Sequence, residues 1–261
     1  MSVRIGIGVD MWANRGNSFS AQYQAILAEG TAQGYTLPSA SQQVKQNILL
    51  NTLISSGVWA KLDTLFVLAN DGGASFACIN WKNPSGTKAT LINSPTFTSN
   101  AGFTGNGTSS YIDTGYTSVG AGNYTLNNAS RYTYIKTLVA NRIIDGIASS
   151  VANSITTFVS ANQRINQSGA NLSISFDYST SGAGMKSIHR TSSTSVTCYN
   201  NNSASSGLTA TSTGLATENQ LILRSASGYG SHQVSFYAMG ASLISENSSL
   251  VSAFSTYINS L

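Results

Sequence analysis

Carboxylate side chains are the first candidates for chemistry in this sequence, because acid–base catalysis usually depends on Asp or Glu. A glycosidase needs two carboxylates that converge on one bond. The nine acidic residues are mostly isolated and no two of them lie two positions apart: Asp10, Glu29, Asp63, Asp71, Asp113, Asp145, Asp177, Glu218 and Glu246. A pair assembled from distant strands stays open, but no feature of the sequence points to one. We therefore predict that the protein is not an enzyme.

The sequence gives little more support for nucleophilic catalysis or for a metal site. His189 and His232 are the only histidines, and neither neighbours a nucleophile elbow. The His and Cys residues lack the close spacing of a zinc site. We expect no cofactor, with calcium as the one open option, held by Asp and backbone carbonyls at Asp71 or Asp113. The competing interpretation of Asp113, which precedes Thr114-Gly115, is a turn-capping acceptor.

Sugar binding is chemistry that the sequence does support. A sugar site combines an aromatic surface with amide and hydroxyl groups around its edge. Two segments supply both at strand ends, Tyr199–Asn202 and Ser227–His232. From them we predict the glycan-binding residues Tyr199, Asn200, Asn201, Tyr229 and His232. The competing interpretation is that both segments are solvated loops with one aromatic residue each.

Helical spacing of apolar residues marks both ends of the chain. A first helix is predicted after Ser18 and ends at Gly30 or Gly34. A second helix begins near Ser39 or Ser41 and ends at Gly57, and residues 58–62 add one further turn. Because the apolar face of this helical hairpin is narrow, we predict that the hairpin lies against the sandwich or a neighbouring subunit and does not form its own domain. Residues 245–261 form a closing helix.

Between these helices the pattern changes to short β runs separated by Gly, Asn and Ser. Leu65–Ala69 is a continuous apolar strand, ended by the turn signal Asn70-Asp71-Gly72-Gly73. Further strands are predicted at Phe76–Trp81, Thr90–Asn93, Ser110–Gly115, Tyr132–Val139, Ile143–Ile147, Ile155–Val159, Leu172–Tyr178, Met185–His189, Ser195–Tyr199, Gln220–Arg224 and Gln233–Met239. Many short strands at regular intervals favour a sandwich or barrel.

Charged residues are scarce, at 8% of the chain against about 25% in an average soluble domain. The net charge of +4 comes from scattered residues, so the sequence shows no patch of the kind that binds nucleic acid. No apolar run reaches transmembrane length, and the opening is not typical of a signal peptide. Cys78 and Cys198 lie in apolar runs, which predicts buried free thiols.

The first residues of the chain suit subunit contacts. They form an extended apolar segment, and a surface rich in hydroxyls and amides instead of charges suits a protein packed against copies of itself. We predict self-association, as a trimer or a pentamer. The predicted assembly contacts are Val3, Ile5, Ile7, Val9 and Trp12.

Several stretches resemble a known family. Gly102–Gly115, Val234–Leu243 and the closing Phe254–Leu261 are similar to segments of the concanavalin A-like (laminin-G-like) jelly roll of many phage and bacterial surface proteins. Gly34–Ser39 and Gly57–Asp63 resemble the helical preface of uncharacterised phage tail or head fibre and appendage proteins. In the glucanase branch of this superfamily the two catalytic carboxylates alternate along one strand, and this sequence lacks that spacing.

The resemblance implies a mainly β fold: a concanavalin A-like jelly-roll sandwich with an N-terminal helical hairpin and a C-terminal helix. We predict two parts, residues 1–63 for attachment and assembly and residues 64–261 for the sandwich. The expected function is a phage virion structural protein, made in the host cytoplasm, as a spike, fibre, capsid-associated or decoration subunit. It would contact other virion proteins and host surface glycans. A free carbohydrate-binding lectin is the first alternative, and a glycoside hydrolase or lyase the second.

Overall fold

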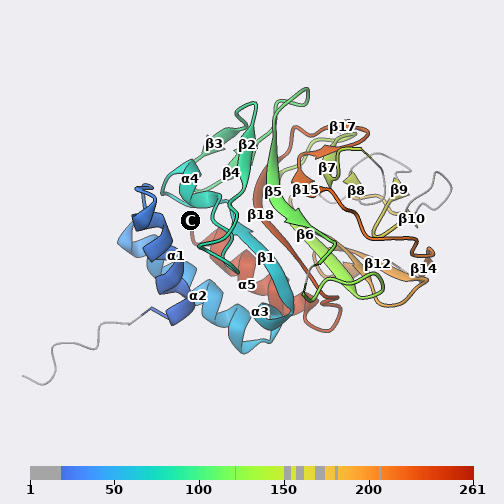
Figure 1. The fold of residues 1–261 in the computed structure, drawn as a ribbon, viewed down its shortest axis with the longest axis horizontal. Coiled ribbons are helices and arrows are strands. Elements are labelled where there is room, and N and C mark those ends of the chain that lie inside the picture. Colours follow the sequence, from blue (N-terminus) through green and yellow to red (C-terminus); the bar gives the residue numbers. More distant parts are fainter. Residues whose placement is uncertain are drawn as a thin grey trace, which may run out of the picture.

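The computed structural model describes residues 19–120, 122–149, 154–156, 162–167, 174–179, 182–205 and 207–261. Its architecture is mainly β, with antiparallel sheets between an N-terminal helical hairpin and a C-terminal helix (Figure 1). This confirms the predicted fold class. The helical layer joins segments far apart in the chain, since the blue helix α2 lies beside the red helix α5 in Figure 1 and α1 packs against α2.

The helices begin and end close to the predicted positions. Ser39 caps the second helix, where its hydroxyl accepts a hydrogen bond from the Gln42 N–H at 3.3 Å. Gly57 adopts a left-handed φ of 78° and separates that helix from the next turn, as expected for a glycine stop. The helices are α1 (Ala21–Ala32), α2 (Ala40–Ser55), α3 (Val58–Lys61), α4 (Ala74–Ala77) and α5 (Asn247–Asn259).

Within the described residues, nine strands form the larger sheet. Its centre is β18, which pairs with β6 along one edge and with β4 and β1 along the other. The sheet continues from β6 through β11 to β12. Its strands are β1 (Leu62–Val67), β3 (Thr96–Thr98), β4 (Gly102–Thr104), β6 (Ala129–Thr137), β11 (Gly184–Arg190), β12 (Ser195–Asn200), β13 (Ser203–Ala204), β14 (Leu208–Thr209) and β18 (Gln233–Gly240).

A second sheet of five described strands faces the first, in the order β2-β5-β15-β7-β8. Its strands are β2 (Thr90–Ile92), β5 (Tyr111–Thr117), β7 (Ile143–Gly146), β8 (Ser154–Thr156) and β15 (Asn219–Ile222). Two short pairs complete the β structure, namely β9 (Asn162–Gln163) with β10 (Ile174–Ser175), and β16 (Arg224–Ser225) with β17 (Gly228–Tyr229).

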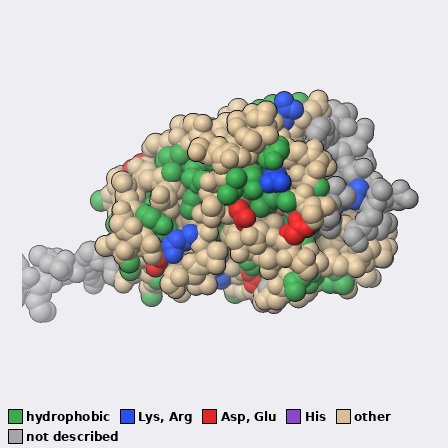
Figure 2. Space-filling model, turned by 45° about the horizontal axis from the view of Figure 1, so that its top comes forward, with side chains coloured by type: hydrophobic (Ala, Val, Ile, Leu, Met, Phe, Trp, Pro, Cys, Tyr) green, Lys and Arg blue, Asp and Glu red, His purple; other side chains and the backbone are tan. Residues whose placement is uncertain are grey.

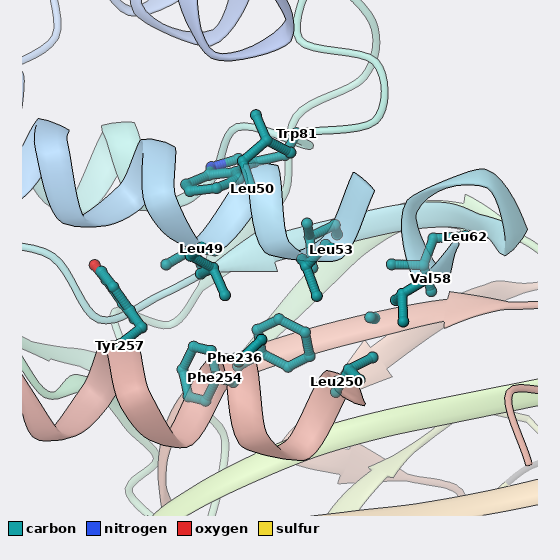
Figure 3. Close-up of a cluster of buried hydrophobic side chains, with 14 of the residues drawn as sticks. Leu49, Leu50, Leu53, Val58, Leu62, Trp81, Phe236, Leu250, Phe254 and Tyr257 are labelled. Atoms are coloured by element: carbon teal, nitrogen blue, oxygen red, sulfur yellow. The ribbon is translucent and has the colours of Figure 1, made fainter. Parts of the chain in front are cut away.

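The larger sheet is buried on both faces, and the described residues form one large apolar core against each face. One core lies between this sheet and the helices, where Leu49 of α2 and Phe254 of α5 meet Phe236 of β18 (Figure 3). The other lies between the two sheets and includes Phe103 and Ile222. The apolar run Leu65–Ala69, which begins in β1, is continuous because its successive side chains alternate between the two cores.

One predicted strand is wrong. The run Phe76–Trp81 does not form a strand, because it begins within the short helix α4 and continues beyond its end. Phe76 and Ile79, three residues apart, enter the core under the helices, whereas Ala77 and Cys78 enter the core between the sheets. A short apolar run cannot be assigned to helix or strand by periodicity alone. The helical turn that follows Gly72-Gly73 therefore lets this run place apolar side chains in both cores.

The predicted state of the cysteines is confirmed, since Cys78 and Cys198 are both buried and free. Burial raises the pKa of each thiol to about 12. Among the helices that the structure describes, none has the length and apolar character needed to span a membrane. The predicted division at residue 63 falls inside β1, and the separate attachment role of residues 1–63 stays a prediction.

Charged groups are also buried between the two sheets. Arg131 of β6 and Asp145 of β7 are both 0% exposed and lie 3.4 Å apart, between the Nη2 and Oδ1 atoms. Arg131 also donates from Nη2 to the Arg164 carbonyl oxygen at 2.9 Å. Arg190 of β11 donates to the carbonyl oxygens of Ile165 and Ala210. The two arginines therefore anchor residues 164–165 over the interior of the sandwich.

Candidate functional site

The first predicted glycan segment is a tight hairpin turn at the end of β12. The Asn200 side-chain oxygen accepts a hydrogen bond from Lys186 Nζ at 2.7 Å. Asn201 has a left-handed φ of 53°, and its side-chain oxygen accepts from the Met185 N–H at 2.8 Å. The half-buried ring of Tyr199 packs edge-on against His189, with ring centroids 5.1 Å apart. These three side chains all hold the hairpin together.

The second predicted segment is divided between the surface and the interior. Tyr229 lies on β17 and is half-buried, whereas His232 is 0% exposed. The His232 Nδ1 atom accepts a hydrogen bond from the Val139 N–H at 3.1 Å. His232 therefore stabilises the interior, and only Tyr229 of this segment presents an aromatic ring near the surface.

The burial of the two histidines predicts how the free energy of unfolding depends on pH. Burial lowers the pKa of His189 to about 3, and burial together with the nearby Arg142 charge lowers that of His232 to about 4. The unfolded chain titrates near pH 6.5, so between about pH 6.5 and 4 it binds protons that the folded chain excludes. The free energy of unfolding should therefore be highest above pH 6.5 and fall as the pH drops through this range.

Urea unfolding at a series of pH values measures this slope. His232→Asn, which keeps a side-chain acceptor for the Val139 N–H, should reduce it. A free energy of unfolding that is constant between pH 7 and 4 in the wild type would contradict the burial of the neutral imidazoles.

The predicted calcium ligands have structural partners in separate places. The Asp71 carboxylate accepts hydrogen bonds from the Ser39 N–H at 2.9 Å and from its hydroxyl at 2.5 Å, at the start of α2. The Asp113 carboxylate accepts from the Gly115 N–H at 2.9 Å, which is the arrangement of a turn-capping acceptor. Among the described residues, no three His, Cys, Asp or Glu side chains are grouped as a metal site would require. The predicted assembly contacts Val3, Ile5, Ile7, Val9 and Trp12 lie outside the described residues.

A different cluster forms around Tyr229, and it is the candidate site. The Arg224 guanidinium lies over the ring of Tyr111, 4.6 Å from its centroid, and 5.3 Å from the centroid of the Tyr229 ring. The two tyrosine rings are 6.2 Å apart and inclined by 46°. All three side chains are half-buried. We call Tyr111, Arg224 and Tyr229 the tyrosine–arginine cluster.

Three strands position this cluster. Tyr111 begins β5, where strand alternation places it on the face opposite the fully buried Ile112. Arg224 and Tyr229 are direct partners in the β16–β17 hairpin. Leu223, between β15 and β16, has a φ of 66° although its side chain is buried. A left-handed conformation is costly for a bulky residue, and such strain is often found at functional sites.

A rigid loop borders the cluster. The Asn106 side-chain oxygen accepts hydrogen bonds from the N–H groups of residues 108, 109 and 110 at 2.8–3.0 Å. The Gly107 N–H donates to the Gly230 carbonyl oxygen, beside Tyr229, at 3.1 Å. Gly105, just before the loop, allows this close approach, since a Cβ atom there would lie 2.2 Å from the Gly230 carbonyl oxygen. The loop thus brings amide and hydroxyl groups to the edge of the cluster in a fixed shape.

Sequence reasoning found one member of the cluster and missed two. Tyr229 was predicted from its polar neighbours, but Tyr111 and Arg224 were assigned only to strands. The cluster depends on the pairing of β5 with β15, which joins residues more than one hundred positions apart. The available signal was the resemblance of Gly102–Gly115, which places Tyr111 directly after a glycine-rich turn.

Comparison with known proteins identifies no family. No protein-family model and no curated protein matches the chain. Among solved structures, domain 4 of a GH43 extracellular arabinanase from Geobacillus stearothermophilus, in complex with arabinotriose, is similar over 73% of this chain and 98% of its own, with 11% identity and a TM-score of 0.46. A Trypanosoma rangeli sialidase matches 82% of this chain, which spans 40% of the sialidase, with 9% identity and a TM-score of 0.48.

The binding domain of botulinum neurotoxin DC, solved in complex with SialylT, matches 76% of this chain and 51% of its own. Its identity is 10% and its TM-score is 0.38. At these identities and scores, the three matches establish neither a family nor an activity for this chain.

Proposed function

We propose that this chain is a non-enzymatic, glycan-binding structural subunit of a phage-type virion, and that the tyrosine–arginine cluster is its glycan site. The observation that carries the glycan proposal is the placement of Arg224 against the rings of Tyr111 and Tyr229. Sugar sites combine an aromatic surface with a few fixed polar groups. Here Tyr229 supplies the aromatic surface, and Arg224 supplies N–H donors beside it.

Fixed geometry favours binding at this cluster over the predicted turn after β12. The loop at residues 106–110 is held by several hydrogen bonds of its own, so little conformational entropy is lost when a ligand binds. Among the described residues the Arg224 donors make no hydrogen bond, whereas the side-chain oxygens of Asn200 and Asn201 already accept hydrogen bonds from the protein. A sugar would have to displace these bonds.

The positions of the carboxylates support a non-enzymatic role. Asp10 lies outside the described residues, and the other eight acidic side chains each accept a hydrogen bond or join an ion pair. A glycosidase needs one carboxylic acid and one carboxylate facing each other across a sugar. Polysaccharide turnover that a single Asp or Glu substitution abolishes would instead support a glycoside hydrolase or lyase.

The low charge of the chain and its apolar first residues both support a place in a virion assembly. Figure 2 shows a face on which charged side chains are isolated among polar and apolar groups, in keeping with 8% charged residues overall. The apolar residues Val3, Ile5, Ile7 and Val9 would then contact sister subunits in a trimer or pentamer, or other virion proteins. Light scattering of the full chain against a variant without residues 1–18 tests this, with an oligomer expected only for the full chain. A full-length monomer would instead favour a free lectin.

The glycan proposal predicts the effect of removing one ring. Tyr229→Ala should weaken binding of a glycan identified on an array by at least about tenfold, since a tenfold change corresponds to about 1.4 kcal/mol and an aromatic contact contributes about 0.5–1.5 kcal/mol beyond its buried area. Titration calorimetry measures the affinity. Tyr199→Ala is the matched control, because it removes an equally half-buried tyrosine from the turn after β12. An array without any bound glycan, or equal losses in both variants, would contradict the proposal.

A further inference from the structure

Arg224 differs from the buried arginines of the sandwich in where its hydrogen-bond donors point. Arg131 and Arg190 donate to backbone carbonyl oxygens inside the molecule. In the part of the chain that the structure describes, the Arg224 guanidinium makes ring contacts and no hydrogen bond or ion pair. A guanidinium has five N–H donors and no acceptor. Arg224 therefore offers a full set of donors at a half-buried position.

The tyrosine rings hold this guanidinium in place. It lies over the Tyr111 ring at 4.6 Å and near the Tyr229 ring at 5.3 Å. Contact with aromatic rings restricts a long side chain, and among the described residues no hydrogen bond or ion pair uses the Arg224 N–H donors. A partner that needs two parallel N–H donors would meet a preorganised fork.

The charged groups around the cluster favour an anionic partner. Arg142 lies near the loop that borders the cluster, where its Nε atom donates to the Ser231 hydroxyl at 3.3 Å; Ser231 follows Tyr229 by two residues. Asp113 follows Tyr111 by two positions on β5, and its carboxylate already accepts the Gly115 N–H. Of these described charged residues near the cluster, two are arginines and one is an aspartate whose carboxylate has a structural partner.

We infer that the ligand of this site is an acidic sugar, whose carboxylate pairs with the edge of the Arg224 guanidinium while its ring lies against Tyr229. This inference rests on the proposed glycan-binding function and adds the class of sugar. Arginine and a carboxylate form two parallel charge-assisted hydrogen bonds, which are stronger than neutral ones and fix the orientation of the partner. A neutral sugar would leave this fork without its matching acceptor.

A matched pair of oligosaccharides tests the inference. One is an oligosaccharide of a uronic acid, and the other is the same compound with its carboxyl groups reduced to alcohols. Titration calorimetry should give an affinity at least about tenfold higher for the acid. In Arg224→Gln the two affinities should become equal within about twofold. Arg224→Lys should keep only part of the preference, because an ammonium is a point charge without the planar fork.

The outcomes separate this inference from the proposed function. If the wild type binds the reduced and the acidic compound equally well, the site binds glycans but the inference fails. If it binds neither compound and no other glycan, both fail. If a sulfated oligosaccharide binds and the uronic acid does not, the carboxylate assignment is wrong. The unfolding temperatures of both Arg224 variants are the control. If they equal that of the wild type, any loss of affinity comes from the site and not from the fold.

Discussion

Asp145→Ala is expected to destabilise the fold by about 3–5 kcal/mol, which is the usual cost of leaving one partner of a buried ion pair without the other. Arg131 and Asp145 are both 0% exposed, and they join β6 of the larger sheet to β7 of the smaller one. Without the carboxylate, the Arg131 cation stays between the sheets with the Arg164 carbonyl oxygen as its remaining partner. Urea unfolding followed by circular dichroism measures the loss.

The double variant Arg131→Met, Asp145→Leu is the control for this prediction. Replacing a buried ion pair by apolar residues of similar volume is often neutral or stabilising, so the double variant should recover most of the lost stability. A loss below about 1 kcal/mol for Asp145→Ala alone would show that the pair is hydrated or separated. Natural domains have only about 5–15 kcal/mol of stability, so the predicted loss is a large share of it.

Phe254→Ala should cost a similar amount, about 3–5 kcal/mol, because it removes a large ring from a closed core. Phe254 is 0% exposed on α5. Its ring lies 4.6 Å from that of Phe236 on β18 and 5.0 Å from that of Tyr134 on β6 (Figure 3 shows the first contact). The substitution would leave a cavity where the C-terminal helix meets the larger sheet.

Ile48→Ala is the matched control, since Ile48 belongs to the same helical layer but is 56% exposed. Surface substitutions of this kind usually change stability by less than about 0.5 kcal/mol. Thermal and urea unfolding of the two variants compare the sites directly. Equal losses for Phe254→Ala and Ile48→Ala would mean that α5 does not pack on the sheet as described.

The elements of this fold were largely predictable because local patterns define them. Apolar residues at helical spacing located α1, α2 and α5, and Gly57 located the end of α2. The layers that cover the two faces of the larger sheet were not predictable. A continuous apolar run such as Leu65–Ala69 indicates burial on both faces without naming the layers. The same ambiguity explains why Phe76–Trp81 was predicted as a strand.

The candidate site was predictable only in part, since its members meet through long-range pairing. Tyr229 was found from its own polar neighbours, but Arg224 gains its role from the ring of Tyr111, which β5 supplies. The burial of His232 depends on Val139, ninety-three positions earlier. A single sequence does not show such partners, whereas turn residues and helix caps act on their immediate neighbours.

A crystal structure of the protein with a bound uronic-acid oligosaccharide tests the central claim most directly. We predict that a sugar ring lies against Tyr229 and that its carboxylate accepts two hydrogen bonds from Arg224, with the loop at residues 106–110 at its edge. A sugar bound instead at the turn that contains Tyr199 and Asn200, with the tyrosine–arginine cluster left empty, would contradict the claim.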